Sequence, residues 1–442
     1  MLKQKKITKE SLTDLAWKDI IQKYNIIREI ERIGSYYISS KQIKEYREPR
    51  LMAKFDSSLS LPTVFKENYL NILPVSKSGY VLGKFKLYEP FPSLENFNQK
   101  IPQIELPDLE TVDIEKITSE ANAINVLQMS GILKEFLGIS EEQSLYSTFN
   151  SRMGSGEFTF KVDTYDSRSQ QVSVKNAQIE IDGGFESEDY VVIVEAKNVI
   201  HSDFHVRQLY YPYRKWHPLV TKPIRLVFSI YSNKIYRLLE YKFTDINDYS
   251  SIKFLKEKYY SLEDTTITID DLKNVYDEVD CIHSDDQTEG SVPSVQADSF
   301  ERVISLLENM YDNEMTKEDI RELMQFTDRQ VGYYYNAGKY LGLFYKKKNS
   351  DNKIVYTLTN LGEEIYEANY KIRQLKLVAQ ILQHKIFREL FRQVLLEGEL
   401  PEKNVIAELE LDYNMVSSRS TADRRASSIR AWLSWIFNLT NL

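Results

Sequence analysis

The sequence has a single cysteine, Cys281, which excludes an internal disulfide. Its five histidines and that cysteine show none of the spacings typical of a zinc site. The basic N-terminus has no continuous apolar segment, and no later stretch is apolar over the length needed to span a bilayer. We therefore expect a cytoplasmic protein in a reducing compartment, neither secreted nor embedded in a membrane.

The chain also lacks an overall excess of positive charge, since its formal net charge is -8 at pH 7. Taken alone, this argues against nucleic acid as a partner, because a polyanion is usually bound by a basic surface. The distribution of charge matters more than the sum. Acidic residues gather at residues 312–322, whereas residues 416–430 contain four arginines and one aspartate.

Length and composition favour a multidomain α+β (α/β) protein. The 442 residues exceed what one hydrophobic core usually organises, and 42% of them are hydrophobic while 28% are charged. Residues 283–298 are rich in turn-forming residues and lack periodicity, which is typical of a linker. The expected division is an N-terminal α+β domain, a sheet domain, a linker, a winged-helix domain and a helical C-terminal region, at residues 1–115, 116–280, 281–299, 300–370 and 371–442.

The middle of the chain has the pattern of a mixed sheet. Residues 119–138 carry apolar residues at helical spacing and end at a glycine. Five strand patterns rich in Val, Ile, Phe and Tyr follow, at residues 158–162, 172–182, 190–197, 223–232 and 234–243. A helical segment at residues 203–215 separates the third strand from the fourth. This order predicts a helix that crosses between two strands of one sheet.

Two acidic residues and a lysine lie at the ends of neighbouring strands in this pattern. Asp182 ends one predicted strand directly before a Gly183-Gly184 turn, and Glu195 lies late in the next. Because side chains alternate along a strand, Glu195 and Lys197 are expected to point to the same face. Neighbouring carboxylates suit a hard cation such as Mg²⁺, which promotes phosphodiester hydrolysis by polarising the phosphate and activating water.

An acidic residue two positions before a lysine is common by chance, and its ordinary explanation is a solvated strand end. The strand that leads to Glu195 is apolar on both faces, however, as expected for a buried central strand. An acid and a lysine at the exit of such a strand therefore favour a functional site.

The segments QIEIDGG, VIVEAKN and RQLYYPYR follow one another as in the nuclease core of type II restriction endonucleases of the PD-(D/E)xK superfamily, which residues 119–243 resemble well. The resemblance implies a restriction-endonuclease-like mixed sheet flanked by helices. It also implies that Asp182 and Glu195 bind Mg²⁺ and that Lys197 assists the attacking water. Ile181 stands where the superfamily usually has a proline, a departure that it often tolerates.

The same resemblance suggests further site residues. Glu120 is the candidate for an acid from the preceding helix, although a charge that complements the helix dipole explains it equally well. Gln208 and Tyr211 resemble positions that steady the site, or else they pack in the core. Arg152 and Ser155, in a Gly-rich loop entering the sheet, are candidates for a phosphate contact, with a plain turn as the alternative.

Residues 300–442 have the pattern of a winged helix followed by more helices. Helical patterns at residues 300–311, 316–325 and 328–341 precede a hairpin at residues 344–359, and a winged helix is built in this way. Its third helix usually lies in the major groove of DNA. The candidate DNA contacts are Arg329, Gln330, Tyr333 and Asn336 on that helix, with Lys346, Lys347 and Lys348 on the hairpin. Protein docking is the alternative role for such a domain.

A basic segment near the C-terminus, STADRRASSIRAWLSWI, resembles regions that accompany such winged helices in restriction enzymes. Arginines suit phosphates and guanine edges, and the candidates here are Arg419, Arg424, Arg425 and Arg430. Trp432 and Trp435 follow at a spacing typical of core residues. A further cluster of Arg47, Arg50 and Lys54 is suited to DNA recognition by the N-terminal domain, or else forms salt bridges with Glu48 and Asp56.

We therefore expect a sequence-specific endonuclease that cuts double-stranded DNA with Mg²⁺, as type II restriction enzymes do. A double-strand break needs two active sites, so a homodimer or a dimer of dimers is expected, with a cognate DNA methyltransferase as genetic partner. Two alternatives stay open. One is another defence or repair nuclease that acts on modified DNA, and the other is a non-catalytic winged-helix regulator.

Overall fold

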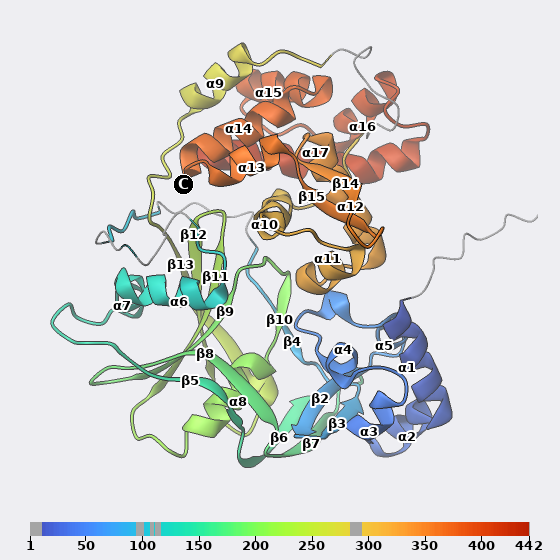
Figure 1. The fold of residues 1–442 in the computed structure, drawn as a ribbon, viewed down its shortest axis with the longest axis vertical. Helices are drawn as coiled ribbons and strands as arrows, with labels where there is room; N and C mark the ends of the chain where they lie inside the picture. The colour runs from blue at the N-terminus through green and yellow to red at the C-terminus, as the bar shows by residue number, and fades with distance from the viewer. Residues whose placement is uncertain (1–10, 94–100, 107–109, 111–115, 283–293, 442) are drawn as a thin grey trace, which may run out of the picture.

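The computed structural model describes residues 11–93, 101–106, 110, 116–282 and 294–441. An N-terminal domain lies beside a sheet domain, and a helical C-terminal domain lies above both (Figure 1). The fold is mixed α+β, as expected. Most of the expected linker at residues 281–299 lies outside the described residues. Within them, no helix combines the length and the apolar character that a membrane span requires.

The N-terminal domain packs five helices around a three-stranded antiparallel sheet of order β1-β3-β2. Its elements are α1 (Leu12–Lys23), α2 (Ile26–Ile33), β1 (Ser35–Ser39), α3 (Ser40–Lys44), α4 (Pro49–Ala53), α5 (Thr63–Glu67), β2 (Asn71–Ser76) and β3 (Gly79–Gly83). Helices α1 and α2 are separate because Asn25 adopts a left-handed conformation between them. The indole of Trp17 is fully buried in the core and donates to the Met52 carbonyl at 2.8 Å.

The middle domain is built on a six-stranded mixed sheet of order β13-β12-β11-β9-β8-β5. The strands are β5 (Tyr146–Gly154), β8 (Gln178–Glu186), β9 (Val191–Lys197), β11 (Ile224–Ser232), β12 (Ile235–Phe243) and β13 (Ile252–Ser261). Strands β9 and β11 are parallel and are connected through α8 (Arg207–Trp216), while the other neighbours are antiparallel. This confirms the prediction of a mixed sheet with a crossing helix.

Helices cover both faces of this sheet and bury the central strand β9. On one face, α6 (Glu120–Met129) and α7 (Ile132–Leu137) pack in a cluster that includes Val192 and Val194, and α8 packs on the other face in a cluster that includes Ile193. All residues from Val191 to Ala196 are buried, as predicted for this strand. Successive side chains of β9 therefore enter two different cores.

Several elements differ from the prediction for local reasons. The strand expected at residues 172–182 is divided between β7 (Ser169–Lys175) and β8, because Asn176 has a φ of 54°. Strand β7 pairs with β6 (Glu157–Asp163) in a separate hairpin. Gly131, with a φ of 72°, divides the helix expected at residues 119–138 into α6 and α7. Asp203 begins a short strand, β10 (Asp203–His205), which pairs with β4 (Tyr88–Pro90), and is not part of the helix.

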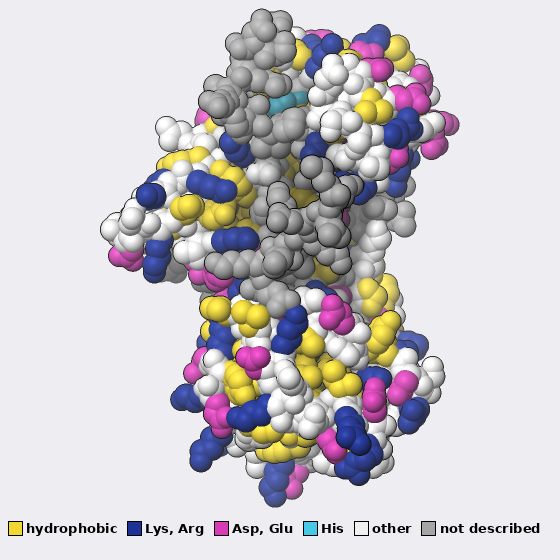
Figure 2. Space-filling model, turned by 90° about the vertical axis from the view of Figure 1, so that its right-hand side faces the viewer, with side chains coloured by type: hydrophobic (Ala, Val, Ile, Leu, Met, Phe, Trp, Pro, Cys, Tyr) yellow, Lys and Arg dark blue, Asp and Glu magenta, His cyan; other side chains and the backbone are white. Residues whose placement is uncertain are grey.

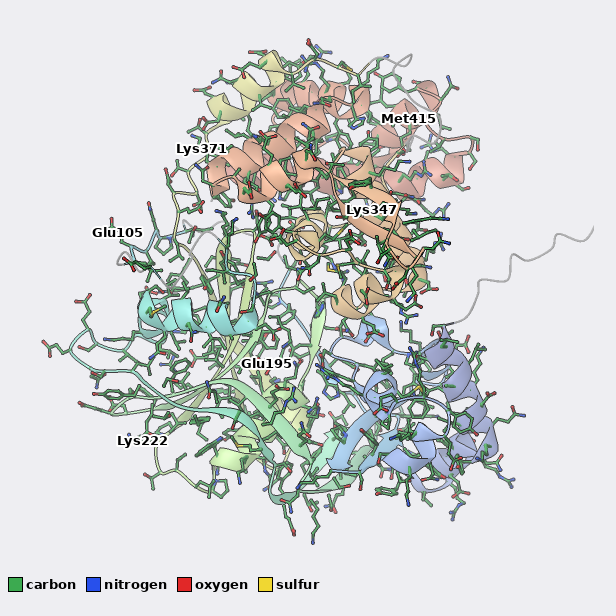
Figure 3. The ribbon with its side chains drawn as sticks, viewed as in Figure 1. Glu105, Glu195, Lys222, Lys347, Lys371 and Met415 are labelled. Atoms are coloured by element: carbon green, nitrogen blue, oxygen red, sulfur yellow. The ribbon has the colours of Figure 1, made fainter. Side chains whose placement is uncertain are left out.

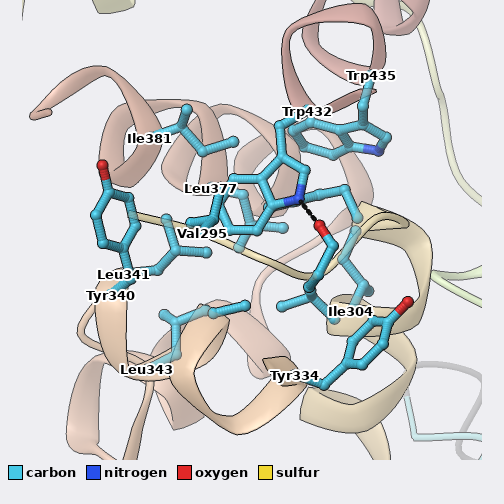
Figure 4. Close-up of a cluster of buried hydrophobic side chains, with 14 of the residues drawn as sticks. Val295, Ile304, Tyr334, Tyr340, Leu341, Leu343, Leu377, Ile381, Trp432 and Trp435 are labelled. Carbon is cyan, nitrogen blue, oxygen red and sulfur yellow. Dashed lines mark hydrogen bonds between the residues drawn. The ribbon is translucent and has the colours of Figure 1, made fainter. Parts of the chain in front are cut away.

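The C-terminal domain contains the three helices and the hairpin predicted from the sequence. They are α10 (Phe300–Met310), α11 (Lys317–Met324), α12 (Asp328–Tyr340), β14 (Phe344–Lys348) and β15 (Ile354–Leu358). Five helices follow, α13 (Asn360–Glu367), α14 (Tyr370–Leu382), α15 (Lys385–Glu397), α16 (Lys403–Asp412) and α17 (Arg419–Asn438). Trp432 is fully buried among them and donates to the Ala297 carbonyl at 3.0 Å (Figure 4), so it is a core residue, as predicted.

The sheet domain and the C-terminal domain are joined by buried polar contacts. Arg373 of α14 is 1% exposed and pairs with Glu308 of α10 at 2.8 Å. The same carboxylate accepts from the Asn233 backbone at the β11–β12 turn, at 2.9 Å. In addition, α9 (Ile269–Glu278), which falls within residues 116–280, packs against α14 through the Lys371–Asp271 ion pair at 2.9 Å.

Candidate active site

Asp182 lies where two antiparallel strands separate. The register of β8 with β9 runs from the Glu186 and Val191 pair to the Gly183 and Val194 pair and stops there. At the next step along the strands, the Ala196 N–H donates to Oδ2 of Asp182 at 2.9 Å. The side chain of Asp182 therefore occupies the position where a strand would place a backbone carbonyl, and its carboxylate is fixed against β9.

The prediction of a tight Gly183-Gly184 turn after Asp182 is wrong, because β8 continues through both glycines to Glu186. The need for glycine at position 184 comes instead from the packing of β5 against β8. Between Gly184 and Ile181 the pairing with β5 advances three residues on β8 but only two on β5, which is a β-bulge. A Cβ on Gly184 would lie 2.4 Å from the Phe149 carbonyl oxygen, so the close approach of β5 requires glycine there.

Glu195 and Lys197 meet in one cluster with residues from helices on both faces of the sheet. Nζ of Lys197 lies 2.8 Å from Oε1 of Glu195 and 3.4 Å from Oε1 of Glu120, which begins α6. Gln208 of α8 donates from Nε2 to the same oxygen of Glu195. Figure 3 shows Glu195 near the centre of the molecule, where the three domains approach one another. Four of the predicted catalytic residues are thus in direct contact.

The cluster holds more carboxylates than cations. Burial raises the pKa of Glu195, which is 7% exposed, to about 8, and Asp182 and Asp56 add to this rise while Lys197 opposes it. Burial also raises the pKa of Glu120, although Lys197 opposes it. For Lys197 itself, burial is outweighed by the surrounding carboxylates, which raise its pKa above the ordinary range. The ammonium is therefore retained, and a cation bound beside Glu195 would favour the ionised form of its carboxyl group.

Asp56 of the N-terminal domain belongs to the same electrostatic environment and was missed by sequence reasoning. Its carboxylate lies 3.5 Å from Nζ of Lys54, which is one of the salt bridges expected as an alternative for the basic cluster. Burial disfavours its charge, but Lys54, Lys197 and Arg207 together lower its pKa. No sequence signal links Asp56 to the site, because only the packing of two domains brings it there.

The segment that follows Lys197 is held by the C-terminal domain. The Ile200 N–H donates to Oγ of Ser305, Asn309 donates from Nδ2 to the Asn198 carbonyl, and Nε2 of His201 contacts the Leu323 carbonyl, each at 3.3 Å. Burial lowers the pKa of His201 to about 4, so its ring is neutral at physiological pH. Three polar contacts thus fix the exit of β9 against α10 and α11.

The next residues of this connection are held by the N-terminal domain. Asp203 accepts from Oγ of Ser57 at 2.6 Å and from the Ser58 N–H at 2.9 Å. The His205 N–H donates to the Asp56 carbonyl at 3.0 Å. The loop that carries Asp56 is therefore attached to the connection between Lys197 and Gln208.

A cleft of about 830 Å³ opens beside the cluster. Glu120 and Lys197 line its floor together with Asp56, and its walls come from the N-terminal domain and from α11 and α12. A molecule in this cleft would meet all three domains.

The donor set suits Mg²⁺, which usually binds one or two carboxylates and keeps several waters. Asp182 and Glu195 are the residues able to hold it. Oε1 of Gln208 is buried beside Glu195 and has no hydrogen-bond partner in the part of the chain that the structure describes, so the site still has a polar group to satisfy. Among those residues, no group of three or more His, Cys, Asp or Glu side chains is arranged to hold a metal ion.

Three other residues considered for the site have different surroundings. Tyr211 is fully buried, donates to the Pro74 carbonyl at 3.0 Å and stacks edge-on against Phe158, so it packs between domains. Arg152 lies in β5, not in a loop, and pairs with Glu180 at 3.0 Å. Ser155 follows β5 as a buried residue whose hydroxyl donates to the Gly156 carbonyl at 2.9 Å.

The predicted DNA contacts of α12 and the hairpin lie on the surface of the C-terminal domain. Arg329 lines the cleft and donates to the hydroxyl of Tyr333, whereas Asn336 is exposed. Gln330 caps its own helix by accepting from the Thr327 N–H at 2.9 Å. Nζ of Lys346 lies 4.2 Å from the Tyr335 ring centroid, and Lys347 pairs with Glu314 at 2.6 Å.

The arginines of the C-terminal segment lie on α17 and have contacts within the domain. Arg419 pairs with Asp423 at 2.9 Å, Arg424 donates to the Ser420 carbonyl at 3.3 Å, and Arg430 donates to the Pro401 carbonyl at 3.2 Å. Nε of Arg425 is buried and has no hydrogen-bond partner within the described ranges.

Basic and acidic side chains are interspersed over the N-terminal domain on the face shown in Figure 2.

Three family models match successive parts of the chain. Residues 14–82 are similar to DUF6996, residues 83–261 to DUF6997 and residues 302–441 to DUF7226, each of which is described as a domain of unknown function. No match was found among curated proteins or among solved structures.

Proposed function

We propose that the protein is a Mg²⁺-dependent endonuclease that hydrolyses phosphodiester bonds of DNA. The observation that carries this proposal is the contact of Lys197 with Glu195 and Glu120 beside the Asp182 carboxylate, at the point where β8 and β9 separate. Two carboxylates for a hard cation and an ammonium for the developing charge are the groups that phosphodiester hydrolysis needs.

Each residue has a distinct role in this proposal. Asp182 and Glu195 hold the cation, which polarises the phosphate and lowers the pKa of the attacking water when it is bound. Gln208 orients Glu195 through its donated hydrogen bond, as groups behind metal ligands usually do. Lys197 donates to the negative charge that develops on the phosphate. Glu120 positions Lys197 from the opposite face of the sheet.

The proposed fold relationship is to the PD-(D/E)xK superfamily, in its type II restriction enzyme branch. A mixed sheet with a crossing helix after the lysine strand supports it, because the site residues then lie in the order that the resemblance implies. The three helices and hairpin of residues 300–358 support a winged helix that binds DNA. The proposal also includes sequence-specific cleavage of double-stranded DNA. It further includes a homodimer or dimer of dimers, and a cognate DNA methyltransferase as genetic partner.

The test is cleavage of plasmid DNA with Mg²⁺, and with Ca²⁺ in its place. We expect cleavage by the wild type with Mg²⁺ only, and its loss in Lys197→Ala and Asp182→Asn. Lys175→Ala is the matched control, because Lys175 pairs with Glu157 on the separate β6–β7 hairpin. Cleavage that persists in both site variants would refute the assignment. Plasmids with and without methylated bases separate a restriction enzyme from a nuclease that acts on modified DNA.

A further inference from the structure

The route to the catalytic cluster is restricted by the position of the N-terminal domain. Lys197 and Glu120 line the cleft, so a phosphodiester bound in it can reach Lys197. Its walls are formed by α4 and the residues after it on one side, and by α11 and the start of α12 on the other. A substrate in this cleft therefore lies between the N-terminal and C-terminal domains.

One cation on the N-terminal wall, Arg50, differs from its neighbours in its contacts. Arg50 is exposed in the cleft, and its guanidinium has no ion pair or hydrogen bond within the described residues. Its neighbours differ in this respect. Lys54 pairs with Asp56 at 3.5 Å, and Lys66 donates to the Leu59 carbonyl at 2.6 Å. Among the described residues of this wall, Arg50 is thus the cation able to bind a ligand without breaking an internal contact.

The opposite wall presents a second arginine. Arg329 stands in the exposed first turn of α12, with its guanidinium carbon 5.2 Å from the Tyr333 ring centroid, and within the described residues only its Nε makes a hydrogen bond, to the Tyr333 hydroxyl. By contrast, Arg321 lies 3.5 Å from Asp328 and 3.8 Å from Glu318. The two terminal nitrogens of Arg329 are therefore the counterpart of Arg50 across the cleft.

The size of the cleft limits what it holds. A volume of about 830 Å³ is that of a site for a drug-sized molecule, since such pockets span roughly 300–1,000 Å³. A few nucleotides of one strand have this size, whereas a turn of duplex is far larger.

We propose that the cleft binds the scissile strand of the DNA, with Arg50 on a phosphate to one side of the cleaved bond and Arg329 on a phosphate to the other. The proposal rests on the proposed nuclease function and adds the path of the substrate to it. On the wall that carries Arg50, the carboxylate of Asp14 accepts from the Thr63 N–H at 2.5 Å and that of Asp56 pairs with Lys54, so both already have partners. The N-terminal domain is then part of the substrate site and not only a recognition module.

The experiment measures DNA binding without cleavage, using a fluorescent duplex of random sequence in Ca²⁺ over a range of salt concentrations. Each phosphate contact contributes about 0.9 to the slope of log affinity against log salt. We expect Arg50→Ala and Arg329→Ala each to lower the slope by about one, and the double variant by about two. Arg50→Lys should retain most of the slope. Arg28→Ala is the control, because Arg28 is exposed on α2 of the same domain and does not line the cleft.

An Arg50→Ala slope equal to that of Arg28→Ala, in a protein that cuts plasmid DNA with Mg²⁺, would overturn this inference alone. A wild type that neither binds DNA in Ca²⁺ nor cuts it in Mg²⁺ would overturn the proposed function. Arg50 is exposed, so a loss of folding is not expected, and an unchanged melting temperature of the variant checks this.

Discussion

Replacing Glu195 by glutamine should change how the stability of the metal-free protein depends on pH. In the folded protein the pKa of Glu195 is raised from 4.5 to about 8 by burial. Between these values the folded state keeps a proton that the unfolded chain has released, so stability is lost as pH rises through this window. Glutamine has nearly the same shape as the protonated acid and does not titrate, so the variant escapes this loss.

The size of the effect follows from the two pKa values. From about pH 6 to about pH 8, a single group with this shift loses roughly 2 kcal/mol of stabilisation. For a domain of the size of the sheet domain, this loss of stability lowers the unfolding midpoint by roughly 4–8 °C. His201 and His205 are buried with lowered pKa values and act in the opposite direction near pH 6. They are present in both proteins, so the difference between wild type and variant isolates Glu195.

Calorimetry in EDTA at several pH values measures both proteins. We expect the midpoint of Glu195→Gln to rise relative to the wild type as pH increases. Mg²⁺ added near pH 8 should narrow this gap, because it stabilises the wild type through the ionised carboxylate and has less to bind in the variant. Parallel pH profiles for the two proteins would show that Glu195 does not hold its proton in the folded state, and the electrostatic reasoning for the site would fail.

Other predictions follow from single contacts. Asp56→Asn should lower the affinity for Mg²⁺ by roughly 10- to 100-fold in calorimetric titrations, as loss of a supporting carboxylate does, and an unchanged affinity would remove Asp56 from the site. Ser305→Ala frees the Ile200 N–H, so plasmid cleavage should slow roughly tenfold or more while DNA binding in Ca²⁺ is unchanged, and equal rates would contradict this positioning role. Trp432→Ala should destabilise the C-terminal domain by roughly 3–5 kcal/mol in urea unfolding, whereas an effect below about 1 kcal/mol would contradict its place in the core.

The central strand and the helix after it could be predicted because their patterns are local. Residues 191–194 are apolar without alternation, as expected for a strand buried on both faces, and the structure has them buried. The surroundings of Asp182 could not be predicted, because Gly183-Gly184 has the composition of a turn, whereas in the structure Gly184 is required by the close approach of Phe149 from β5. The edge strand β5 itself is largely exposed and shows no apolar alternation to reveal it.

Contacts between domains could not be predicted from the sequence either. Asp56 and the two arginines of the cleft come together only when the N-terminal and C-terminal domains pack on the connection after Lys197. Gln330 stays a predicted base contact, and the structure adds that its side chain caps the start of α12.

The most direct test of the metal site is diffraction at the manganese edge from crystals of the protein with DNA and Mn²⁺. The proposed function predicts an anomalous peak within coordination distance of carboxylate oxygens of both Asp182 and Glu195, with Lys197 beside the phosphate. An anomalous peak elsewhere would contradict the proposed function. The absence of a peak between these two carboxylates, in crystals whose other Mn²⁺ sites are fully occupied, would also contradict it.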